Sequence, residues 1–132
     1  MKKQTSSFTQ SSRTRLIAYW ITTGIIGLEL GVGAIWDLAK IPFVTQAMEH
    51  LGYPSYFLLF MGLWKAPGVI VLLAPGFLRL KEWVYAGIVF VYTGATFSHG
   101  VMGDYKDMTG PLIFTGLTFA SWVLRPTTRK LT

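Results

Sequence analysis

The first long apolar stretch, residues 16–38 with the sequence LIAYWITTGIIGLELGVGAIWDL, decides the fold of this chain. Its only charged side chains are those of Glu29 and Asp37. A helix needs roughly 20 consecutive apolar residues to cross the hydrocarbon core of a bilayer. The stretch therefore predicts a membrane-spanning helix.

Three further apolar segments follow, separated by turn signals that contain Gly, Pro or Asp. The segments are residues 56–73, 83–101 and 111–124. Backbone groups find no hydrogen-bond partner in lipid, so helices are the expected spanning form. The predicted fold is an all-α, integral membrane four-helix bundle over residues 15–126. A polar N-terminal tail, residues 1–14, is expected to be disordered, and residues 127–132 form a C-terminal tail.

The composition agrees with a lipid environment. Apolar residues make up 52% of the 132-residue chain and charged residues only 14%, whereas soluble domains carry about 25% charged residues. The chain has no Cys, which excludes disulfides, thiolate nucleophiles and Cys metal ligands.

The basic residues give the predicted bundle a direction. With the N-terminus inside, nine of the 12 basic residues are cytoplasmic: Lys2, Lys3, Arg13, Arg15, Arg79, Lys81, Arg125, Arg129 and Lys130. Lys40 and Lys106 then lie outside, and Lys65 lies within a helix. This positive-inside bias predicts that both termini are cytoplasmic. It also explains the net charge of +6 without a nucleic-acid partner.

Two charges fall near the middle of predicted helices, Glu29 in the first and Lys65 in the second. A charge at this depth costs about 2.5–3.5 kcal/mol on insertion scales, so each of these charges is expected to have a structural or functional role. The two residues lie at similar depth, which predicts that they approach each other directly or through a water. Such a pair could handle protons or orient a ligand, or it could be a structural ion pair that fixes helix register.

The third predicted helix places polar residues on one face that runs toward the outer side: Tyr85, Tyr92, Thr96 and His99. Together with the charges of the first two helices, they predict a polar cavity that opens outward. The predicted ligand-binding residues are Glu29, Asp37, Lys65, Tyr92, Thr96, His99 and Asp104. Of these, His99, Glu29 and Lys65 are the candidate catalytic residues, because they can exchange protons.

A metal or haem is not expected. The chain has only two His residues, His50 and His99, which excludes a three-His zinc site within one chain. Asp107 and Lys106, in the loop after His99, are predicted to be solvated.

From Leu51 onward the chain resembles the DoxX-like family of small bacterial membrane proteins. The resemblance rests on the order and spacing of many short elements: Leu51-Gly52-Tyr53-Pro54, Gly62, Lys65, Pro75-Gly76, Arg79 to Trp83, Tyr85-Ala86-Gly87, Gly94-Ala95, Ser98-His99 and Gly103-Asp104. It implies a four-helix protein of the bacterial inner membrane. The wider group includes subunits linked to thiosulfate:quinone oxidoreduction and a relative that acts in channel assembly.

Three functions stay open at this point. The first is a quinone- or small-hydrophobic-ligand-binding subunit of a membrane redox system, whose redox cofactor a partner would supply. The second is a non-enzymatic assembly or chaperone-like protein, and the third is a small oligomeric proton-coupled carrier. The expected partners are the lipid bilayer and a membrane or cytoplasmic protein, with a homo-oligomer also open. Whether the chain is an enzyme is undecided.

Overall fold

A computed structural model describes the backbone of residues 2–131 and the side chains from Ser12 onward. The described residues are all-helical, which confirms the all-α part of the predicted fold class. Its α-helices are α1 (Lys2–Ala39), α2 (Pro42–Leu51), α3 (Tyr56–Leu73), α4 (Leu78–Val101) and α5 (Thr109–Leu124). A short 3-10 helix, Thr127–Arg129, follows α5.

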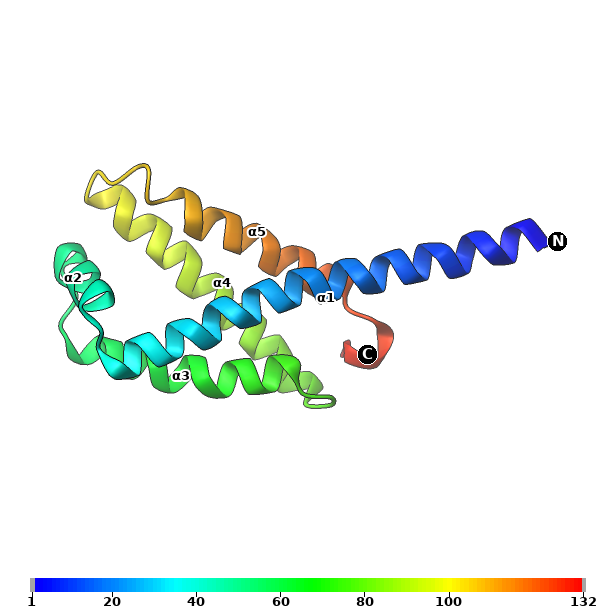
Figure 1. Cartoon of the computed structure of the whole chain (residues 1–132), viewed down its shortest axis with the longest axis horizontal. Coiled ribbons are helices and arrows are strands. Elements are labelled where there is room, and N and C mark those ends of the chain that lie inside the picture. The colour runs from blue at the N-terminus through cyan, green and yellow to red at the C-terminus, as the bar shows by residue number, and fades with distance from the viewer. Residues whose placement is uncertain (1, 132) are drawn as a thin grey trace.

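The four long helices run alternately in opposite directions, and α2 lies across one end of them (Figure 1). Helix α1 packs against α3 and α5, while α4 packs against α5 and α3. The two chain termini lie toward one end of the molecule, and α2 and the α4–α5 connection lie at the other (Figure 1).

Two boundaries differ from those expected from sequence. Helix α1 begins at Lys2, although residues 1–14 are expected to be disordered. Adding a residue to an existing helix is far easier than nucleating one, so the polar residues can continue the long apolar helix. Helix α4 begins at Leu78 rather than Trp83, because the basic residues of the turn join its first turns.

Helix α2 has no counterpart in the predicted elements. Pro42 stands at its start, where a missing N–H costs nothing. Gly52 ends it in the left-handed conformation, with φ of 85°, and donates its N–H to Glu49. The helix is only 10 residues long, too short to stand out as an apolar segment.

Many large apolar side chains are exposed, and several polar side chains are buried beside an apolar core. Trp83, Phe90 and Phe97 of α4 are 75%, 76% and 73% exposed. The fully buried side chains include the hydroxyl residues Thr23, Thr118 and Ser121. Two helical stretches, Ser12–Ala39 and Tyr56–Leu73, are long and apolar enough to cross a membrane, and α5 is a shorter apolar helix.

Candidate functional site

An ion pair joins the last turn of α1 to the middle of α3. Lys65 Nζ lies 2.8 Å from Asp37 Oδ2 and donates a hydrogen bond to it. The Lys65 side chain is 15% exposed and that of Asp37 only 5%. Two charges that are this well buried need each other, because either one alone would be left without a counter-ion.

The direct ion-pair partner of Lys65 is Asp37, a partner that the sequence did not indicate. Glu29 and Lys65 make no direct ion pair; Lys65 pairs with Asp37 instead. Side chains on a helix tilt toward its N-terminus. The N-terminus of α3 lies at the end of the molecule where α1 finishes (Figure 1). Lys65 therefore tilts toward Asp37, while its Nζ and Glu29 Oε1 both stay close to Gly33.

Glu29 is held by α4. Its Oε2 accepts a hydrogen bond from the hydroxyl of Tyr92, which is buried. Its other oxygen faces Gly33: a Cβ atom at Gly33 would lie 3.9 Å from Glu29 Oε1 and 3.3 Å from Lys65 Nζ. A carboxylate, an ammonium group and a phenol therefore converge beside one glycine of α1. We call Glu29, Asp37, Lys65 and Tyr92 the central polar site.

Thr96 does not join the central polar site. Its hydroxyl donates to the carbonyl of Tyr92, 2.8 Å away within the same helix. This bond satisfies the hydroxyl locally, as Ser and Thr often do in helices.

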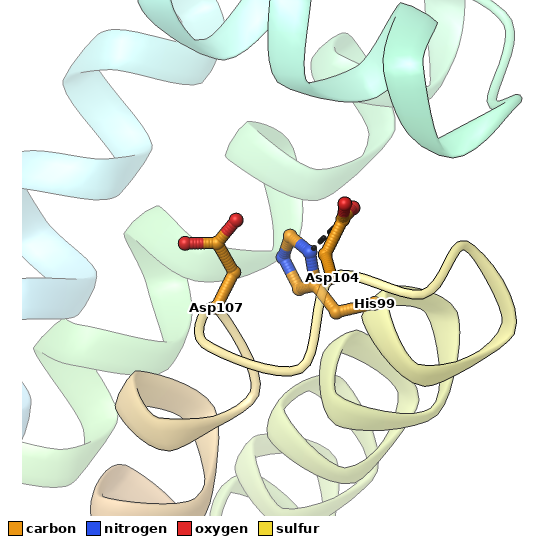
Figure 2. A group of neighbouring side chains, drawn as sticks. All are labelled: His99, Asp104 and Asp107. Atoms are coloured by element: carbon orange, nitrogen blue, oxygen red, sulfur yellow. Dashed lines mark ion pairs between the residues drawn. The ribbon is translucent and has the colours of Figure 1, made fainter.

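The remaining predicted residues meet at the end of the molecule farthest from the termini. The Asp104 carboxylate lies 2.6 Å from His50 Nε2 and 3.5 Å from His99 Nδ1, so it joins α2 to the end of α4. The hydrogen bond from His50 holds the pKa of Asp104 below its ordinary value, and His99 contributes less. Figure 2 shows the His99 ring between Asp104 and Asp107, which come from the loop after α4. Asp107, expected to be merely solvated, thus faces His99.

A second polar network, which the sequence did not indicate, lies among α1, α4 and α5. The hydroxyl of Ser121 is 2.6 Å from that of Thr23 and 2.8 Å from that of Tyr85. All three residues are buried. Small hydroxyl residues inside apolar helices are a known sign of interhelical hydrogen bonds, and this signal could have identified Thr23 and Ser121.

Two cations cover the C-terminal end of α3. Lys81, which is fully buried, donates to the carbonyls of Val71 (2.6 Å), Gly76 (2.8 Å) and Ala74. Arg129 donates to the carbonyls of Leu72 (3.2 Å) and Leu73 (3.0 Å). The last carbonyls of a helix have no partner within it and carry partial negative charge, which both cations balance.

The structure also has an open groove of about 320 Å³ between α4 and α5. Most of its wall is apolar, with the aromatic rings of Tyr85, Phe90, Phe119 and Trp122. None of its lining residues belongs to the predicted ligand-binding set. The groove and the central polar site are therefore separate features.

Exposed apolar side chains together with buried, paired polar groups are typical of helical membrane proteins. A model of the DoxX-like family matches residues 14–121. The chain belongs to the DoxX-like family, which is membrane-associated. Searches of curated proteins and of solved structures found no match.

Proposed function

We propose that the protein crosses the bacterial inner membrane four times, with both termini in the cytoplasm, and binds the head group of a small quinone-like ligand at the central polar site. The exposed aromatic and aliphatic side chains of α4, such as Trp83 and Phe90, support contact of this helix with lipid. The cluster of basic residues around the termini and the α3–α4 turn supports the orientation.

The convergence of Glu29, Lys65 and Tyr92 carries the ligand proposal. The ammonium group of Lys65 has N–H donors beyond its bond to Asp37, and these suit a carbonyl oxygen of a quinone. The Tyr92 hydroxyl would turn from Glu29 to donate to the same head group. The carboxylate of Glu29 accepts a hydrogen bond from the hydroxyl of the reduced form. In an apolar surrounding such groups bind more strongly than in water, because water does not compete for them.

The proposal gives the charged residues complementary roles. Asp37 is the ion-pair partner of Lys65 and fixes its position, which is a positioning role. Glu29 and Lys65 exchange protons with the head group, and His99 lies at the end where protons would meet the outer solution. A ligand that changes its charge and protonation inside lipid needs groups of this kind.

Binding can be tested with the full chain in lipid nanodiscs, using decylubiquinone as the probe and native mass spectrometry as the readout. We expect one saturable quinone per chain. Tyr92→Phe removes one hydrogen bond and is expected to weaken binding about tenfold, equivalent to about 1.4 kcal/mol. Lys106→Met, in the exposed loop after α4, is the matched control and should bind as the wild type does.

A second variant separates loss of binding from loss of folding. In Lys65→Met/Asp37→Asn both charges of the ion pair are removed together, so no buried charge is left alone. This variant should fold and bind quinone weakly. Quinone binding by the double variant at wild-type affinity would disprove the site. No saturable binding by the wild type would disprove the ligand class.

A further inference from the structure

The loop after α4 brings three metal-ligating side chains together. Donor atoms of His99, Asp104 and Asp107 all lie within 4.8 Å of one another. The loop is held by its own backbone: Asp104 N–H donates to the His99 carbonyl (2.9 Å), and Asp107 N–H donates to the Asp104 carbonyl (3.0 Å). Gly103 supplies the positive φ of 77° that the turn needs. The three side chains are therefore presented by a tight, internally bonded turn.

His99 supplies an independent sign of a missing ligand. Its Nδ1 is buried from solvent and makes no hydrogen bond, and the Asp104 oxygen nearest to it is 3.5 Å away. A buried ring nitrogen without a hydrogen bond is unfavourable, and the 3.5 Å contact with Asp104 is too long to supply a good one. Figure 2 shows this nitrogen directed at the carboxylate of Asp104. A cation between the two groups would satisfy both.

The carboxylates point to the same conclusion. Asp107 makes no ion pair or side-chain hydrogen bond among the residues that the structure describes, although it lies beside another carboxylate. Two neighbouring carboxylates repel each other unless a positive charge separates them. The imidazole of His50 lies 2.6 Å from Asp104 and holds this carboxylate from α2. The converging donors are thus one imidazole from α4 and two carboxylates from the following loop.

We propose that His99, Asp104 and Asp107 bind a divalent transition metal ion of the Zn²⁺ class, and that His50 completes or orients the site through Asp104. Imidazole nitrogen favours Zn²⁺ and similar ions, whereas Ca²⁺ and Mg²⁺ prefer sites made of oxygen alone. The metal site lies at the end of the molecule opposite the termini, apart from the central polar site. Bound metal fastens α2 to the α4–α5 loop across that end.

The test measures Zn²⁺ binding by isothermal titration calorimetry on the full chain in detergent, purified with a tag that contains no His. Co²⁺ serves as a second probe, because its visible d–d bands report coordination by nitrogen and oxygen. We expect one Zn²⁺ per chain. Asp107→Asn and His99→Gln should each weaken Zn²⁺ binding by about 100-fold, and His50→Gln by about tenfold, within the range known for ligands and the groups that orient them.

Two controls keep the result interpretable. Glu49→Gln removes an exposed carboxylate from α2 near His50 and should leave Zn²⁺ affinity unchanged. Tyr92→Phe, in the central polar site, should also retain Zn²⁺ binding, so failure of the quinone proposal does not affect this one. Asp107 is exposed, so Asp107→Asn tests the site without disturbing folding.

Three results would overturn the proposal. The first is equal Zn²⁺ binding by the wild type, Asp107→Asn and His99→Gln, which would mean an adventitious ion only. The second is the absence of any Zn²⁺ binding by the folded wild type. The third is displacement of Zn²⁺ by Ca²⁺ at similar concentration, which would assign the loop to a hard, oxygen-binding ion.

Discussion

The Lys65–Asp37 ion pair is the residue-scale feature on which the central polar site depends. Removing one partner leaves the other charged and buried, which destabilises a protein by about 3–5 kcal/mol. We therefore expect Lys65→Met and Asp37→Asn each to lower the free energy of unfolding strongly. The double variant should recover part of that loss, with a coupling energy of about 1–3 kcal/mol.

SDS titration in mixed micelles measures these free energies of unfolding. Glu29→Gln combined with Lys65→Met is the matched control, because Glu29 is not the ion-pair partner of Lys65. The effects of Glu29→Gln and Lys65→Met on the free energy of unfolding should be closer to additive than those of Asp37→Asn and Lys65→Met. A larger coupling for Glu29 than for Asp37 would contradict the pairing described above.

Lys81 is a second charge whose burial has a specific structural cause. Its ammonium group is the shared hydrogen-bond donor for carbonyls at the end of α3. Lys81→Met leaves them without this partner, and we expect a loss of about 1–3 kcal/mol in stability. Arg79→Met, two residues earlier and exposed, should change stability by no more than about 0.5 kcal/mol. Equal melting temperatures for the two variants would refute the capping role.

Glu82 gives the protein a pH dependence at the end where the termini lie. It accepts hydrogen bonds from Trp122 (2.8 Å) and Arg125 (2.5 Å). Burial raises the pKa of Glu82, but these hydrogen bonds and the charge of Arg125 outweigh it and hold the pKa below its ordinary 4.5. The ionised carboxylate therefore stabilises the fold above about pH 4.5, and this stabilisation is lost as pH falls through the lowered pKa.

The measurement is the melting temperature of the wild type and of Glu82→Gln across pH. The difference between the two should stay constant from neutral pH to about pH 4.5 and shrink below it. A difference that stays unchanged down to about pH 3 would show that Glu82 has no lowered pKa.

At the scale of elements, Gly62 sets how closely α3 approaches α1. A Cβ atom at this position would lie 2.7 Å from Leu38 Cγ and 3.3 Å from the carbonyl oxygen of Ala34. Gly62→Ala must push the helices apart or displace Leu38, and we expect a loss of about 1–3 kcal/mol. Gly68→Ala, in the same helix with nothing within 4 Å, is the control and should cause no loss. Similar SDS-unfolding curves for both variants would argue against close packing at Gly62.

Helix contacts show how far sequence reasoning reaches. The apolar length of residues 16–38 and 56–73 is sufficient to predict helices there, because length and hydropathy are properties of the chain alone. Glu29 and Lys65 lie at similar depths along their helices, but depth alone does not determine which neighbour a side chain contacts. The tilt of each side chain toward its own helix N-terminus sends Lys65 to Asp37, and only the arrangement of the helices reveals this.

The loop after α4 shows a second limit of prediction from sequence. Asp104 could be predicted to lie near His99, since only a short stretch separates them. Asp107 and His50 could not be placed there, because a turn of defined geometry and the unpredicted helix α2 bring them in. Their contribution to the proposed metal site depends on tertiary structure rather than on sequence spacing.

At the scale of the whole molecule, the number of membrane crossings decides where the sites open. Among the residues that the structure describes, only Ser12–Ala39 of α1 and Tyr56–Leu73 (α3) are both long and apolar enough to span a membrane on their own. Helix α4 carries exposed Trp83, Phe90 and Phe97 along its length, which would be unfavourable in water. It also packs against α3 and α5 and runs beside them (Figure 1). These features favour four crossings over two.

The two topologies differ in one loop. With four crossings the α4–α5 loop, which carries Lys106, lies outside; with two it lies in the cytoplasm beside the termini. Since the chain has no Cys, single Cys substitutions can be labelled without background. We expect Lys106→Cys to react with a membrane-impermeant maleimide in intact spheroplasts, and Arg79→Cys and Thr128→Cys to react only after permeabilisation. Protection of Lys106→Cys, with Ser55→Cys labelled, would indicate two crossings and put His50 and Asp104 on opposite sides of the membrane, which would contradict their 2.6 Å contact in this fold.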